Sequence, residues 1–98
     1  MSGEVVTAVD AKVDENREQE LLQGYRQLKD APRPDGLLSS ELLRGQGGMW
    51  RIQTTWRDRE ALMALRKSGS PPAALELLDR LGAEHSHGVF TVEDSYVP

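Results

Sequence analysis

The sequence has 98 residues, of which 38% are hydrophobic and 29% are charged, and its formal net charge is -4. This composition is that of an ordinary folded domain and excludes wholesale disorder. Lys and Arg form no cluster long enough to follow a phosphate backbone, which argues against nucleic acid as a partner. A chain this short has a modest core, so association with a second copy is an effective way to bury more surface.

The sequence contains no Cys, which excludes disulfides and thiolate metal sites and fits a reducing cytoplasm. The first ten residues lack a basic segment followed by an apolar one. No apolar run approaches the roughly 20 residues of a membrane span. We therefore expect one cytoplasmic domain over residues 1–98, without a membrane partner and with flexible tails at 1–3 and 94–98.

The first predicted elements are a strand at residues 4–13 and a helix that follows it. The faces of the strand carry Val5, Thr7, Val9, Ala11 and Val13 on one side and Val6, Ala8, Asp10 and Lys12 on the other. The helix begins with Asp14 or Asn16 as its N-cap. It buries a stripe made of Leu21, Leu22, Tyr25 and Leu28. Gly24 weakens this helix by about 1 kcal/mol relative to Ala, which suggests a close packing contact.

A loop at 29–36 and a β-hairpin are expected next. Pro32, Pro34 and the Asp35-Gly36 pair favour the loop. The strand at 37–44 alternates imperfectly, so its inward face stays open. Gly-rich residues 45–48 then predict a hairpin turn. A phosphate-binding loop would need a helix after the glycines, whereas a strand follows.

The strand predicted at 49–56 has the clearest alternation in the chain. One of its faces carries Trp50, Ile52, Thr54 and Trp56. Asp58 follows as the N-cap of a helix at 59–67, which stops at Ser68-Gly69. A further helix restarts with Ser70 as N-cap and Pro71 in its first turn, and it ends at Gly82. The last strand is expected at 84–92, with Phe90 and Val92 on the helix-covered face.

The order β-α-β-β-α-β predicts an α+β fold, namely a ferredoxin-like sandwich with one antiparallel four-stranded sheet. Two helical regions cover only one face of such a sheet. Val6 and Val89 leave the other face half apolar. We therefore expect a homodimer in which a second sheet packs on this face.

Two histidines and an acid-base pair stand out as candidates for chemistry on that second face. Asp10, Arg51, Gln53, His85 and His87 are left over once the helix-covered face is filled. His87 or His85 is a candidate general base that Asp10 would orient. The structural alternative is an ion pair of Asp10 with Arg51 beside two solvated histidines. The histidine pair lacks a third ligand at sensible spacing, so no metal site is predicted.

Aromatic and apolar residues, together with the polar Gln53, supply the candidate substrate contacts. They are Tyr25, Trp50, Trp56, Gln53 and Leu65. Core packing is the alternative for both tryptophans, because each buries a large area. Tyr25 would place its hydroxyl at the mouth of a cleft or simply reach water.

The end of the strand at 49–56 and the start of the next helix form a recognisable pattern. An apolar strand ends in Trp56, a capping residue follows at Asp58, and the helix continues with Glu60, Ala61 and Leu62. This pattern resembles the antibiotic biosynthesis monooxygenase family of small dimeric α+β barrel proteins. The resemblance implies two sheets that close into a barrel, with a cleft for a small apolar or aromatic molecule. Enzymes of that family oxidise polyketide-like phenols to quinones without a metal or flavin cofactor.

Some members of that family degrade haem with an Asn in the first strand and a Trp and a His in the second helix. This sequence has Leu65 and Leu75 near the latter places, and no Asn between residues 4 and 13. Haem degradation is therefore disfavoured. The resemblance implies a cofactor-independent monooxygenase, for which Arg51 would hold the phenolate.

Two other classes of function remain. The first alternative is a non-enzymatic small-molecule-binding or regulatory dimer with the same ferredoxin-like topology. The second, an RNA-recognition module, would need exposed aromatic residues where Arg51 and Gln53 stand.

Overall fold

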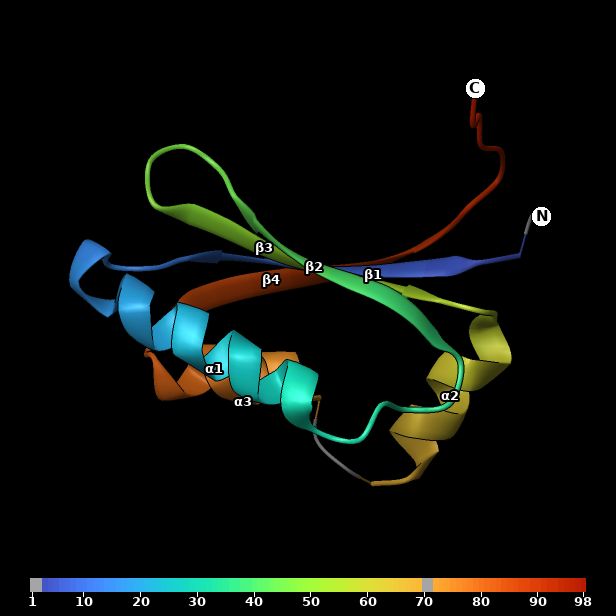
Figure 1. Ribbon diagram of the computed structural model, residues 1–98, viewed down its shortest axis with the longest axis horizontal. Coiled ribbons are helices and arrows are strands. Elements are labelled where there is room, and N and C mark those ends of the chain that lie inside the picture. The colour runs from blue at the N-terminus through green and yellow to red at the C-terminus, as the bar shows by residue number, and fades with distance from the viewer. Residues whose placement is uncertain (1–2, 70–71) are drawn as a thin grey trace.

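The computed structural model of the protein describes residues 3–69 and 72–98. Its elements are β1 (Val5–Lys12), a 3-10 turn η1 (Glu15–Arg17), α1 (Glu18–Asp30), β2 (Leu37–Arg44), β3 (Met49–Trp56), α2 (Arg59–Lys67), α3 (Ala73–Arg80) and β4 (Glu84–Thr91) (Figure 1). The ends of all four strands lie within one residue of those predicted. None of the described helices is long and apolar enough to cross a membrane.

The four strands form one antiparallel sheet in the order β2-β3-β1-β4. All three helices lie on the same side of this sheet (Figure 1). The predicted ferredoxin-like α+β sandwich is therefore confirmed. We call the side under the helices the helix-covered face and the other side the open face.

The registers of the central strands decide which residues occupy each face. Val9 of β1 lies opposite Ile52 of β3 and His87 of β4, and Asp10 lies opposite Arg51. Because side chains alternate along a strand, these two sets point to opposite faces. Val9 and Ile52 are buried on the helix-covered face, so Asp10 and Arg51 belong to the open face.

The prediction for the faces of β4 was wrong. Phe90 lies opposite Val6, on the open face, where it is 59% exposed. Val89 and His87 lie on the helix-covered face instead. The reason is that the helices leave a cavity beneath this edge strand, so its inward positions do not need large core side chains.

An irregularity in β2 explains why its alternation was imperfect. The pairing with β3 shifts between Leu37 and Ser39, which is the effect of a β-bulge. Leu37 lies opposite Trp56, and beyond the bulge Ser40 lies opposite Thr54. Ser40 is therefore turned toward the helix-covered face.

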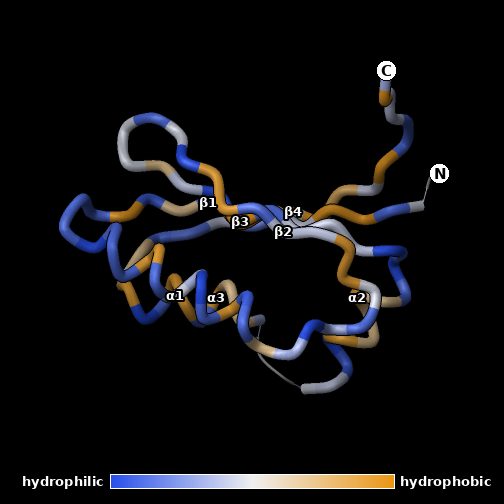
Figure 2. Tube along the Cα trace, viewed as in Figure 1, coloured by the Kyte–Doolittle hydropathy of each residue, from blue (hydrophilic) through white to orange (hydrophobic). Residues whose placement is uncertain are grey.

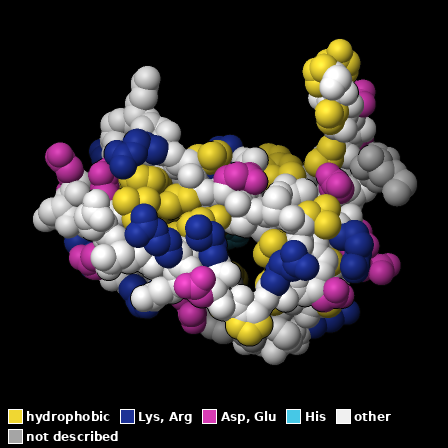
Figure 3. All heavy atoms as spheres, viewed as in Figure 1, with side chains coloured by type: hydrophobic (Ala, Val, Ile, Leu, Met, Phe, Trp, Pro, Cys, Tyr) yellow, Lys and Arg dark blue, Asp and Glu magenta, His cyan; other side chains and the backbone are white. Residues whose placement is uncertain are grey.

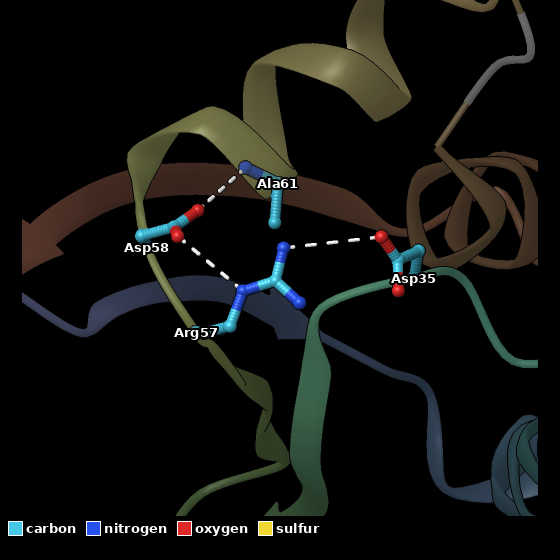
Figure 4. Close-up of polar contacts among 4 residues, drawn as sticks. All are labelled: Asp35, Arg57, Asp58 and Ala61. Carbon is cyan, nitrogen blue, oxygen red and sulfur yellow. Dashed lines mark hydrogen bonds and ion pairs between the residues drawn. The ribbon is translucent and has the colours of Figure 1, made fainter.

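Asp58 caps α2 as predicted. Its Oδ1 accepts a hydrogen bond from the Ala61 backbone N–H at 2.8 Å, and this bond lowers the pKa of the carboxyl group. Arg57 also contacts Asp58 at 3.3 Å and reaches Asp35 at 3.8 Å (Figure 4). Arg57 thereby connects the start of α2 to the loop that precedes β2.

The predicted start of α1 needs correction. Asp14 precedes the η1 turn and makes no side-chain capping bond, and α1 itself begins after Arg17. Asn16 lies inside η1. The predicted cap Ser70 and its neighbour Pro71 lie outside the described residues.

The buried apolar residues form two clusters. Around α1 and α3 the larger cluster contains Val9, Ala11, Val13, Leu21, Tyr25, Trp50, Ile52, Leu77, Leu78 and Leu81. The smaller one, near α2, contains Val5, Trp56 and Leu62. Hydrophobic residues accordingly recur in the strands and in all three helices (Figure 2).

Gly24 lets α1 approach α3 closely, as its position in the sequence suggested. A Cβ atom at this position would collide with the Leu77 side chain. The close contact between the two helices therefore depends on the missing side chain.

Candidate functional site

The interruption between α2 and α3 is associated with a cavity under the sheet. In Figure 1, α1 and α3 lie beneath one half of the sheet and α2 beneath the other end. The cavity has a volume of about 750 Å³, within the range of about 300–1,000 Å³ of small-molecule sites. Both hydrophobic clusters line it, Val9, Tyr25 and Ile52 from the first and Trp56 and Leu62 from the second.

Hydroxyl groups supply much of the polarity of this largely apolar cavity. The Tyr25 hydroxyl lies 2.7 Å from Ser40 Oγ, and Thr54 donates to the same oxygen at 3.4 Å. Trp56 Nε1–H donates to Thr7 Oγ1 at 3.1 Å. Because an indole N–H can only donate, Thr7 accepts this bond and keeps its own proton for another acceptor.

His87 lines the cavity, and histidine is the residue type that most often serves as a general acid or base. His87 lies on β4 opposite Val9, and its neighbours Gly88 and Val89 line the same cavity. Within the described chain, no side chain or backbone group forms a hydrogen bond or ion pair with its imidazole. A ligand in the cavity therefore meets a free imidazole and several hydroxyl groups.

The structure separates the residues that were predicted for the site. Those that line the cavity are Tyr25, Trp56, Leu65 and His87; those that do not are Asp10, Arg51, Gln53, His85 and Trp50. Trp50 is buried in the larger hydrophobic cluster, and the Arg44 guanidinium lies 4.4 Å from the centre of its ring. Gln53 lies opposite Ala8 on the open face.

Asp10 and Arg51 form an ion pair on the open face. Arg51 donates from Nε and Nη2 to the two carboxylate oxygens at 2.7 and 3.1 Å. These hydrogen bonds from Arg51 hold the pKa of the Asp10 carboxyl below its usual value. Since both histidines of β4 lie on the other face, the expected contact of Asp10 with a histidine is not formed.

His85 has a different partner. Its Nε2 lies 2.8 Å from Asp79 Oδ1, so the imidazole joins β4 to the last turn of α3. His85 and His87 share a face, but among the described residues no three His, Asp or Glu side chains are placed to hold a metal ion. The contact of His85 with Asp79 is therefore a structural one.

Sequence reasoning identified Tyr25 but missed Thr7, Ser40 and Thr54, the other hydroxyl residues of the site. Thr7 and Thr54 occupy inward positions of the strands as predicted, yet nothing in the pattern distinguished them from ordinary strand residues. The inward position of Ser40 could not be predicted, because the bulge in β2 interrupts the alternation. A polar residue repeated at inward positions of neighbouring strands was the available signal, because such a position needs a hydrogen-bonding partner.

Solved structures share this architecture. A Deinococcus radiodurans protein provisionally assigned as an antibiotic biosynthesis monooxygenase is 13% identical, with a TM-score of 0.74 over 96% of this chain and 97% of that chain. SnoaB, a cofactor-independent oxygenase from Streptomyces nogalater, is 20% identical, with a TM-score of 0.63 over 95% and 96%. The chain has the fold of the antibiotic biosynthesis monooxygenases. The resemblance found in the sequence is thus confirmed for the fold.

The antibiotic biosynthesis monooxygenase fold also occurs in a protein of different activity. The heme-degrading protein Rv3592 from Mycobacterium tuberculosis is 22% identical, with a TM-score of 0.65 over 98% of this chain and 99% of that chain. No family model matches the sequence, and neither does any curated protein. The fold alone therefore does not decide the activity of this chain.

Proposed function

We propose that the protein is a cofactor-independent monooxygenase that oxidises a small polycyclic phenol to a quinone in the cavity between the sheet and the helices. The observation that carries this proposal is the combination of one imidazole with several hydroxyl groups on apolar walls. The fold shared with a cofactor-independent oxygenase supports the same class of reaction.

Each part of the cavity has a role in this reaction. His87 removes a proton from the bound phenol as a general base. Thr7 and the hydroxyl groups around Ser40 donate hydrogen bonds to the oxygen on which negative charge develops. The apolar walls, including Trp56 and Leu65, exclude water and hold the rings.

The substrate itself supplies the electrons. The deprotonated, electron-rich ring passes electrons to dioxygen, a new C–O bond forms at a ring carbon, and the O–O bond then breaks. Four electrons leave the substrate in total, one oxygen atom enters the quinone, and the second leaves as water with two hydrogens from the substrate. The reaction needs no further reductant.

Oxygen uptake with an anthrone, whose enol is a polycyclic phenol, tests the proposal. Replacing His87 with Ala should lower turnover by about 10²- to 10⁴-fold, the usual cost of losing a positioned general base. His85→Ala should leave turnover near the wild-type value, because His85 is held by Asp79 outside the cavity. The two variants together therefore separate the two histidine candidates. Near wild-type turnover of the folded His87→Ala variant would contradict the assigned role.

One observation favours a second candidate, a small-molecule-binding protein without catalysis. A catalytic imidazole is commonly oriented by a hydrogen bond to its second nitrogen, and His87 lacks such a partner in the described chain. A wild-type protein that consumes no oxygen with any phenol tested, yet retains a bound small molecule, would establish this alternative.

We further infer that two copies associate through the open face. Phe90, Met49 and Leu43 are large, apolar and exposed there, around the small residues Ala8 and Gly88. A second sheet packed on this face would bury them without covering the cavity, which lies on the other side of the sheet.

A further inference from the structure

The mouth of the cavity carries positive charge. Three exposed cations line it, namely Lys29 in the last turn of α1, Arg33 in the loop before β2, and Arg66 near the end of α2. Figure 3 shows a hollow below the sheet with Lys and Arg side chains on both sides of it. Among the described residues that line the cavity there is no Asp or Glu.

These three cations are not neutralised by neighbouring acids. In the described part of the chain, none of Lys29, Arg33 and Arg66 forms an ion pair. Asp35, in the same loop as Arg33, is instead contacted by Arg57 at 3.8 Å (Figure 4). The carboxylate of this loop therefore contacts Arg57 and not Arg33.

The composition of the protein does not explain this arrangement. The chain contains 16 Asp and Glu against 12 Lys and Arg, so an average surface of this protein is acidic. A mouth with three unpaired cations and no lining acid departs from that average. Such a local excess of one charge attracts ligands of the opposite charge.

We propose that the cavity binds an organic anion, a hydroxylated aromatic compound that carries a carboxylate. This inference rests on the proposed function and narrows its substrate class. The cations of the mouth hold the carboxylate, since guanidinium groups match its geometry. The hydroxyl group lies at the floor of the cavity, near Thr7 and Thr54 on the two central strands.

The arrangement of the site predicts the shape of the ligand. The hydroxyl groups of Thr7, Ser40 and Thr54 belong to β1, β2 and β3 on the floor, whereas the cations belong to α1, α2 and the loop at the opening. A ligand that satisfies both carries its acid and its hydroxyl group at opposite ends of a rigid ring system. The compound 6-hydroxy-2-naphthoate has this form, and its methyl ester has the same shape without the charge.

Isothermal titration calorimetry with these two compounds tests the inference. At an ionic strength of about 20 mM the acid should bind at least about tenfold more tightly than its ester, because hydrogen bonds to a charged group contribute more than neutral ones. This preference should shrink at about 300 mM salt, where exposed charges are screened. Equal affinities for acid and ester would overturn the inference.

A matched pair of variants identifies the residues responsible. The double variant Arg33→Gln, Arg66→Gln should lose the preference for the acid while it keeps the affinity for the ester. The control Arg26→Gln, Lys67→Gln changes the net charge equally on exposed positions of α1 and α2 that do not line the cavity. An equal loss in both variants would show a general effect of charge and overturn the site.

Calorimetry together with the oxygen-uptake assay separates this inference from the proposed activity. Selective binding of the acid without oxygen uptake would support the anion site and contradict the monooxygenase. Oxygen uptake on neutral phenols together with equal binding of acid and ester would do the reverse. Binding of neither compound, together with no oxygen uptake by the folded protein, would contradict both.

Discussion

Thr7 accepts a hydrogen bond from the buried indole of Trp56 at 3.1 Å. The two residues lie on neighbouring strands, β1 and β3, and both line the cavity. The bond fixes the indole and at the same time directs the remaining Thr7 proton away from Trp56. One side chain therefore holds a core residue and lines the cavity.

Thr7→Val tests this double role, because valine has nearly the same shape and no hydroxyl group. Trp56 is only 5% exposed, so its N–H loses its partner without gaining water. Leaving a buried donor unpaired costs about 1–3 kcal/mol of unfolding free energy. Urea denaturation should show this loss, and phenol binding should weaken. Thr7→Ser keeps the hydroxyl group and should restore both properties; equal loss in both variants would argue against the hydrogen bond.

Gly24→Ala should destabilise the protein although alanine is the better helix former. The added methyl group collides with Leu77 of α3, which is buried. Overpacking of a core costs about 1–3 kcal/mol, whereas the gain in helix propensity is about 1 kcal/mol. Urea denaturation of Gly24→Ala and of the exposed control Gln23→Ala should differ in sign. If Leu77→Ala does not reduce the effect of Gly24→Ala, the predicted contact is not its cause.

The ion pair of Asp10 with Arg51 makes a prediction about pH. Hydrogen bonds from Arg51 lower the pKa of Asp10 in the folded protein. The stability that this adds is present above the unfolded pKa of about 3.9 and is lost as the pH falls through the lower, folded value. Asp10→Asn should therefore be less stable than the wild type near neutral pH, and the difference should vanish in acid.

A carboxyl NMR titration gives a direct test of the same pair. Arg51→Gln should raise the pKa of Asp10 toward its usual value. The carboxyl of Asp58, whose pKa is lowered chiefly by the Ala61 backbone N–H, should titrate as before. An unchanged Asp10 in the Arg51→Gln variant would show that another group stabilises its charge.

The sequence predicted the elements better than the faces of the outer strands. Trp50, Ile52 and Trp56 recur at every second or fourth position on one face of residues 49–56, so both the bounds and the buried face of β3 were predictable. In β4 each face carries a mixture of polar and apolar residues. The face of Phe90 is decided by its pairing with Val6, which only the assembled sheet shows.

The candidate site was harder to predict for a similar reason. Tyr25, Trp56 and Leu65 line the cavity, because inward positions on well-patterned elements were assigned correctly. His87 also lines it, although its face of β4 was predicted wrongly. The cavity itself depends on how α2 diverges from α3, and this divergence is a property of packing. A bulge in β2 turns Ser40 toward the site. The cations of the mouth come from three separate segments.

The open face provides the last prediction, which concerns assembly. Phe90 is 59% exposed there, and exposed apolar side chains on the face of a sheet favour contact with another sheet. Sedimentation at micromolar concentration should give twice the protomer mass of 10.9 kDa. Phe90→Glu should yield monomer or aggregate, because a charge buried between two sheets is costly. The control Met63→Glu, on an exposed position of α2, should remain a dimer. A stable, folded wild-type monomer under these conditions would contradict the homodimer, and dissociation by Met63→Glu alone would place the interface on the helices.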